Sequence, residues 1–151
     1  MRRLALLLLL AGCGRGAEER NDRPTDGGDE APPAPLQPPP SAEQLAASRA
    51  AADALSLYYE HIGRRDYRAA WTLREQRPGL SFAAFAASFD RYRDYRATVG
   101  VPSLPAEQDG TLWVDVPVQL YGRMRDGSPF GSVGRVTMKR PAGEQAWKVA
   151  P

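Results

Sequence analysis

The stretch LWVDVPVQL, residues 112–120, decides the fold of this chain. Aliphatic residues occupy every second position from Leu112 to Leu120, so one face of the segment is apolar, whereas Asp115 lies on the other face. This alternation is typical of a half-buried strand in an antiparallel sheet. The sequence therefore predicts a central strand whose apolar side packs against a second layer of structure.

Turn signals on both sides of this strand predict a meander. Asp-Gly pairs at 109–110 and 126–127 are typical of tight hairpins between strands. The apolar pattern changes to period two at about residue 95, and further strands are predicted at 130–139 and 146–149. Pro102 and Pro117 are expected at an edge, a bulge or a strand end, because proline cannot donate to the ladder. We expect about four strands.

The residues before the sheet predict three helices. Ser41 with Gln44 forms a capping-box pattern, and Asp66 and Ser81 are N-cap residues for two further helices. The first helix ends at Gly63. Its apolar face comprises Leu45, Ala52, Leu55, Tyr59 and Ile62, and that of the third helix comprises Phe82, Phe85, Phe89 and Tyr92. Helices followed by strands predict an α+β domain with the helices on one face of the sheet.

Composition excludes several classes of site. The chain has 151 residues, which suits one domain of ordinary size. One Cys and one His exclude an internal disulfide and most zinc or iron sites. The 20 basic and 18 acidic residues balance too closely for a protein built to hold nucleic acid. We therefore predict no metal, no cofactor and no nucleic-acid partner.

The first residues have the pattern of a secretory signal. Arg2 and Arg3 precede eight apolar residues, 4–11, and this run is too short to span a bilayer. The sequence LAGC at 10–13 resembles the lipobox of bacterial lipoprotein signal peptides. The resemblance implies cleavage before Cys13 and acylation of that residue, whose acyl chains would hold the protein on a membrane. A signal peptide is thus predicted at 1–12.

The implied location is the cell envelope. In Gram-negative lipoproteins an Asp after the acylated Cys tends to retain the protein at the inner membrane, and this chain has Gly14 there. By resemblance, the protein is expected on the outer membrane, facing the periplasm, if the host is Gram-negative.

A tether is predicted between the anchor and the folded domain. Residues 14–40 contain seven Pro, and Leu36 is their only large apolar residue. Such a segment buries too little apolar surface to offset its ordering entropy, so disorder is expected. The predicted organisation is a signal peptide at 1–12, a lipid-anchored tether at 13–40 and an α+β domain at 41–151.

Three motifs in the folded part resemble one superfamily. Tyr58-Tyr59, the run GRRDYRAAW at 63–71 and Trp147-Lys148-Val149 resemble the nuclear-transport-factor-two-like superfamily, also called cystatin-like or SnoaL-like. The resemblance implies three helices and a strongly curved antiparallel sheet that form a cone around an apolar pocket. The superfamily includes isomerases, dehydratases and hydrolases as well as non-catalytic binding domains, so this fold does not determine activity.

Candidate acid–base residues are few. Catalytic members of the superfamily place a Tyr, Asp, Glu or His inside the cone. His61 is the only His, but it lies beside the core face of its helix and close to the helix C-terminus. A histidine there interacts favourably with the helix dipole, which is a sufficient structural reason for its position. Asp115 lies on the strand face opposite the apolar one. Both are weak candidates, and no catalytic residue is assigned.

Aromatic residues supply the other candidate sites. If the cone encloses a pocket, its wall would comprise Tyr59, Trp71, Phe85, Phe89 and Tyr92, although aromatic residues at helical spacing more often form core. A homodimer or another partner would contact the polar strand face through Trp113, Tyr121 and Arg123. We therefore expect a non-catalytic module that binds an envelope protein or an apolar ligand. The alternative is a small envelope enzyme of the isomerase or dehydratase type acting on an apolar substrate in the cone.

Overall fold

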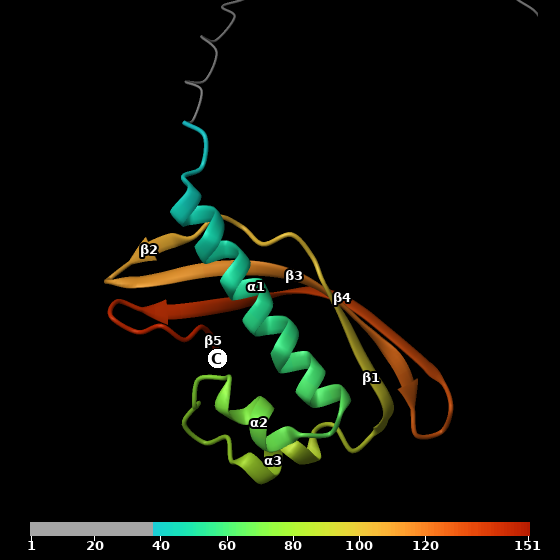
Figure 1. Ribbon diagram of the computed structural model, residues 1–151. Helices are drawn as coiled ribbons and strands as arrows, with labels where there is room; N and C mark the ends of the chain where they lie inside the picture. Colours follow the sequence, from blue (N-terminus) through green and yellow to red (C-terminus); the bar gives the residue numbers. More distant parts are fainter. Residues whose placement is uncertain (1–37) are drawn as a thin grey trace, which may run out of the picture. The chain divides into compact units, whose positions relative to one another are not determined.

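A computed structural model describes residues 38–151, which form three helices followed by a curved antiparallel sheet (Figure 1). The elements are α1 (Ala42–Gly63), α2 (Tyr67–Thr72), α3 (Phe82–Ala87), β1 (Tyr92–Val99), β2 (Ala106–Gln108), β3 (Thr111–Met124), β4 (Pro129–Pro141) and β5 (Lys148–Val149). This confirms the predicted α+β fold. The signal peptide, Cys13 and most of the tether lie outside the described residues.

The predicted N-caps are all present. Ser41 and Gln44 make the reciprocal capping box at the start of α1. The side chains of Asp66 and Ser81 accept hydrogen bonds from the backbone N–H groups of Ala69 and Ala84, at 3.1 Å in both cases. Each bond satisfies a backbone donor that lacks a partner within its helix.

The sheet has five strands rather than about four. Its order is β1-β3-β4-β5, and β2 pairs with β3 as well. The strands β1 and β2 lie one after the other along the same edge of β3, since β1 pairs with its second half and β2 with its first half. Sequence patterning missed β2 because its three residues are all exposed and show no alternation.

The break between β1 and β2 accommodates Pro117. The backbone N–H of Gly100 donates to the Pro117 oxygen at 2.8 Å, which shows that Pro117 turns its nitrogen toward this edge. The pairing between β1 and β3 ends at this point. The N–H group that Pro117 lacks therefore leaves no backbone acceptor of β1 without a donor. Next along this edge, Ser103 satisfies the backbone groups of Asp115 in β3. Its N–H donates to the Asp115 oxygen, and its Oγ accepts from the Asp115 N–H. Pro102 lies in the same connection, between the end of β1 at Val99 and the start of β2 at Ala106, and therefore outside any strand.

The core forms where α1 crosses the apolar face of β3. Val114 and Val116 are fully buried there together with Met138 of β4. On α1 the buried residues are Ser48, Ala51, Leu55, Tyr58 and Ile62. Leu55 and Ile62 were predicted, but Leu45 is 47% exposed, so the buried face is rotated from the predicted one. Small residues at 48 and 51 let the helix approach the sheet, and Ser48 Oγ donates to the Ser103 oxygen at 2.8 Å.

Tyr92 belongs to a strand and not to a helix. The third helix ends at Ala87, and Tyr92 pairs with Met124 as the first residue of β1. The prediction that Tyr92 belongs to the apolar face of the third helix was therefore wrong. Within residues 38–151, no helix has both the length and the apolar run that crossing a bilayer requires.

Candidate functional site

Packed aromatic rings occupy the space between the helices and the sheet. The Phe85 ring lies 5.1 Å from that of Trp71 and 5.3 Å from that of Phe89, measured between centroids. Tyr95 extends the cluster, at 5.4 Å from Phe89 and 5.0 Å from Tyr92. Such edge-to-face and tilted pairs are favourable contacts. The structure thus joins Trp71, Phe85, Phe89 and Tyr92 in what we call the aromatic cluster.

Tyr59 connects this cluster to an open space. Its ring stacks on Tyr95 at 6.3 Å and meets Tyr58 at 5.1 Å. The five residues predicted to wall a pocket therefore do come together, but of these Tyr59 alone lines the cavity of about 490 Å³ described below. Of the other four, Phe85 contacts Trp71 and Phe89, and Tyr92 is linked to them through Tyr95.

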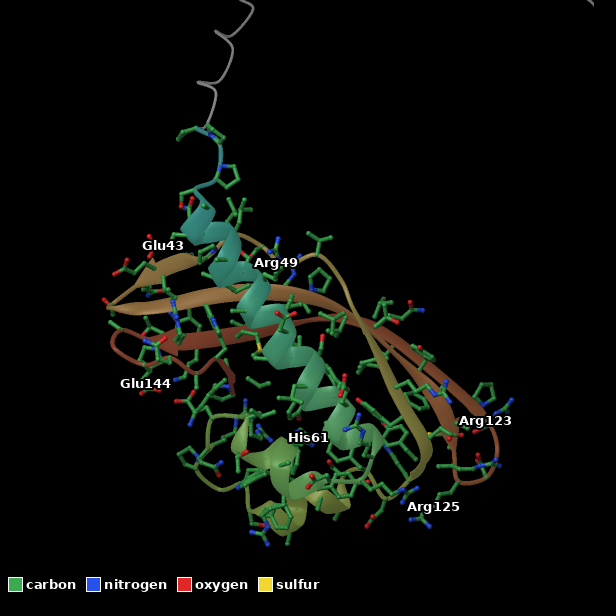
Figure 2. All side chains as sticks on the ribbon, viewed as in Figure 1. Glu43, Arg49, His61, Arg123, Arg125 and Glu144 are labelled. Carbon is green, nitrogen blue, oxygen red and sulfur yellow. The ribbon has the colours of Figure 1, made fainter. Side chains whose placement is uncertain are left out.

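His61 lies near the C-terminal end of α1, where Figure 2 labels it. Its Nδ1 is 3.4 Å from Oδ2 of Asp66, the residue that caps α2. The side chain is 22% exposed. This arrangement joins the end of one helix to the start of the next, and His61 does not line the cavity.

Asp115 lies on the outer face of the sheet, away from α1. Its Oδ1 accepts a hydrogen bond from Thr137 Oγ1 at 2.7 Å, and its Oδ2 is 3.7 Å from Arg135 Nη1. The carboxylate is 41% exposed and is held by groups on the neighbouring strand. It does not line the cavity of about 490 Å³ described below.

The candidate interface residues share that outer face. Trp113, Tyr121 and Arg123 alternate along β3 with residues that face the helices. The Lys139 ammonium lies 5.8 Å from the Trp113 ring centre, and Arg123 donates to the Gly127 oxygen at 3.0 Å. Tyr121 is 40% exposed and pairs with Arg96 of β1 and Gly131 of β4.

A cavity of about 490 Å³ lies between the C-terminal half of α1 and β1. Pockets that bind small molecules typically have about 300–1,000 Å³, so this volume suffices for a ligand or a short peptide segment. The helix contributes Ser56, Tyr59, Glu60, Gly63 and Arg64; the sheet contributes residues 93–97, Val99 and Tyr121. Sequence reasoning singled out only Tyr59 and Tyr121 of this set, because the others come from two elements with no shared motif.

Burial raises the pKa of two of the three tyrosines that line this cavity. It raises the pKa of Tyr59, with smaller contributions from Tyr95 and Tyr58, and it raises the pKa of Tyr95 to about 12, with smaller contributions from Tyr92 and Tyr58. At neutral pH both phenols therefore act as hydrogen-bond donors and not as bases.

The rim of the cavity has an excess of positive charge. Arg64 Nη2 lies 3.3 Å from Glu60 Oε2, and Arg93 Nε lies 3.9 Å from Asp94 Oδ2. Arg96 has no carboxylate within 4.0 Å among residues 38–151. No group of three His, Cys, Asp or Glu side chains in this part of the chain could hold a metal ion.

Comparison with known proteins identifies the fold. No protein-family model and no curated protein sequence matches the chain. Solved structures do match it. One is an NTF2-like superfamily protein from Salmonella enterica serovar Typhimurium, with 12% identity, 69% of this chain and 86% of that chain covered, and a TM-score of 0.52.

Two further structures give the same result. A Streptomyces avermitilis protein assigned as a dehydratase of the NTF2-like family has 12% identity, 70% and 96% coverage and a TM-score of 0.51. A Novosphingobium aromaticivorans protein assigned as an aromatic ring hydroxylase has 16% identity, 74% and 87% coverage and a TM-score of 0.55. At these identities the likeness concerns the fold alone. The described part of this chain has the nuclear-transport-factor-two-like (NTF2-like) α+β fold.

Proposed function

We propose that this protein is a lipid-anchored lipoprotein of the cell envelope whose NTF2-like domain is a non-catalytic binding module. The observation that carries the proposal is the packed interior. Apart from Tyr58 and Trp147, Ser48 is the only buried residue with a polar side chain among residues 38–151, and aromatic rings pack against one another between the helices and the sheet. An acid–base mechanism needs an ionisable group within hydrogen-bond reach of an enclosed substrate.

The sequence supports the anchor. Cys13 is the only cysteine and stands at the end of the LAGC motif. A free thiol outside the cytoplasm is prone to intermolecular disulfides, and acylation removes that hazard. Two or three acyl chains together hold a protein on a membrane far more firmly than one. The proposed location is the outer membrane, facing the periplasm, in a Gram-negative host.

Surface features favour a protein partner over an enclosed apolar ligand. The cavity beside β1 is rimmed by charged side chains, which suit a polar or charged partner better than an apolar ligand. Trp113, Tyr121 and Arg123 on the outer face supply the residue types that protein interfaces favour. A second copy of the chain on this face is compatible with the same role.

The alternative function is a small envelope enzyme of the isomerase or dehydratase type. It is favoured by one observation, the likeness to a protein assigned as a dehydratase. In this chain the cavity's protonated tyrosines could orient a substrate, but Glu60, the helix carboxylate at the cavity, is 56% exposed and paired with Arg64. If the wild-type protein turned over a substrate and Tyr59→Phe abolished that turnover, this alternative would be established.

Two measurements test the proposal in cells that make the full-length protein. Cys13→Ala should move the protein from the membrane to the soluble fraction of the envelope, while Ser41→Ala, which keeps the motif intact, should leave it on the membrane. Chemical crosslinking of the wild-type protein in the native envelope should give a defined adduct with one partner. Unchanged membrane association of Cys13→Ala contradicts the anchor, and absence of any adduct contradicts the binding role.

A further inference from the structure

The free edge of β1 leaves backbone groups without partners. In antiparallel strands, the N–H and C=O of successive residues point alternately to the two sides. The bond from the Gly100 N–H to the Pro117 oxygen shows that Gly100 faces β3. With the regular register from Asp94 to Val99, Arg96 and Thr98 also face β3, so the backbone groups of Tyr95, Ala97 and Val99 face away from it.

No described element covers most of this edge. The sheet order places β1 outermost. Apart from the pairing with β3, Ala97 and Val99 take part in no hydrogen bond found between residues of the described range 38–151. The end of α1 does reach Tyr95, because a Cβ added to Gly63 would lie 3.1 Å from the Tyr95 oxygen. The open part of the edge thus begins after Tyr95.

The cavity runs along this open edge. Ala97 and Val99 form part of its wall, with Ser56 and Tyr59 of α1 opposite. Beyond Val99 the chain continues into Val101, whose residue surface is 87% exposed. A groove thus follows the unpaired backbone, with a helix on one side and a strand edge on the other.

We propose that an extended segment of a partner protein, carrying an acidic residue, adds to β1 as a further strand in this groove. The inference rests on the binding role proposed above and names its site. Ala97 and Val99 each present one donor and one acceptor, two residues apart, or about 6.6 Å along the strand. A polypeptide main chain repeats its own donors and acceptors at that spacing, which is the basis of recognition by strand addition.

Charge indicates the kind of segment. Arg64, Arg93 and Arg96 rim the cavity against the two carboxylates of Glu60 and Asp94. Arg96 is the cation without a carboxylate neighbour in the described range, so an acidic side chain of the partner would pair with it. Charged residues on an edge strand also discourage self-pairing of identical strands. The edge therefore favours an acidic strand over a second copy of itself.

The decisive variant removes one backbone donor and little else. Ala97→Pro deletes an N–H that points away from β3, and proline is tolerated at such edge positions. Glu107→Pro is the matched control: Glu107 pairs with Leu112 between the hydrogen-bonded pairs of β2 and β3, so its N–H also points to the free edge, but it does not line the cavity. Equal melting temperatures of both variants would establish that each folds.

The experiment uses the full-length protein in detergent micelles and a display library of random twelve-residue peptides. We expect enrichment of peptides with an acidic residue. For a synthetic copy of an enriched peptide, Ala97→Pro should weaken binding at least tenfold, Arg96→Glu about fivefold or more, and Glu107→Pro less than twofold. Hydrogen exchange at the Ala97 and Val99 amides should slow when the peptide binds.

Three outcomes overturn the proposal: no enriched peptide, binding that survives Ala97→Pro, or unchanged exchange at both amides. Binding of a small carboxylate such as benzoate in the cavity, with no peptide binding, likewise overturns it in favour of a small-ligand site. Failure here is separable from failure of the binding role itself. If Ala97→Pro retains the wild-type crosslinked adduct in the envelope, the protein is a binding module that uses another face.

Discussion

The two sides of α1 differ in how they meet the rest of the domain. One side packs on β3 and the aromatic cluster, where Leu55 is fully buried and Phe85 is 4% exposed. The other side meets β1 where Tyr59 and Gly63 approach Tyr95, and a cavity of about 490 Å³ lies beside these contacts. The first region removes large apolar side chains from water and supplies stability. The second leaves backbone groups and arginines accessible, which is the state a binding surface requires.

The largest loss of stability should follow from removing a buried side chain on the packed side of α1. Phe85 contacts the rings of Tyr58, Trp71 and Phe89. Phe85→Ala should lower the free energy of unfolding by about 3–5 kcal/mol, measured by urea denaturation, because it removes buried surface and leaves a cavity. A loss below about 1 kcal/mol would mean that this side is not closely packed, and the contrast between the two sides would disappear.

The next largest effect concerns Gly122, which closes the sheet beside the aromatic cluster. Its φ is +154°, and an added Cβ would overlap the backbone oxygen of Asp94 and lie 2.9 Å from the Phe130 ring. Gly122→Ala should therefore cost about 3 kcal/mol, through backbone strain and the displaced neighbours.

Gly127 provides the matched control for that change. Its φ is +87°, but an added Cβ would meet nothing within 4 Å. Gly127→Ala should cost only about 1 kcal/mol, the strain of the left-handed backbone alone. Equal losses for the two variants in the same denaturation measurement would refute the close approach of β1 to Gly122.

Tyr95 contacts the aromatic cluster and also lines the cavity. Its burial should be visible in the pH dependence of the free energy of unfolding. Its folded pKa, about 12, lies above the ordinary tyrosine value of about 10, so the unfolded chain releases the proton first as pH rises. The unfolded state then binds fewer protons, and the free energy of unfolding should fall between pH 10 and pH 12. Tyr95→Phe should flatten this fall relative to the wild type in denaturation curves. An identical slope for both proteins would show that Tyr95 is not desolvated.

The smallest effect should come from the open side. Glu60 and Arg64 form an ion pair on α1 with side chains 56% and 71% exposed. Glu60→Gln should change the free energy of unfolding by less than about 0.5 kcal/mol, because exposed pairs at this spacing contribute little. A loss above about 1.5 kcal/mol would show that the cavity wall is part of the stabilising core.

Local signals in the sequence were sufficient for the helix starts and the hairpins. Ser41, Asp66 and Ser81 cap helices because a side-chain oxygen needs only a backbone N–H two or three residues away. Asp109 and Gly110 both adopt positive φ in the turn between β2 and β3, a conformation that these residue types tolerate. Such features depend on neighbours along the chain, so the chain alone specifies them.

Features that depend on distant partners were missed or misplaced. Tyr92 fits the helical spacing of Phe85 and Phe89 as well as it fits a strand, and its pairing with Met124 decides between them. Leu45 fits the apolar stripe of α1, yet the contact of Ser48 with Ser103 sets the rotation of the helix and leaves Leu45 exposed.

By itself the sequence determined an α+β domain, the order of helices and strands, the helix caps, and a signal-like start ending at Cys13. Only the tertiary structure decided that the aromatic residues pack against one another and that the cavity lies instead between α1 and the free edge of β1. The physical reason is that capping and alternation act over a few residues. Whether a space between two elements is filled depends on side chains brought together from the whole length of the domain.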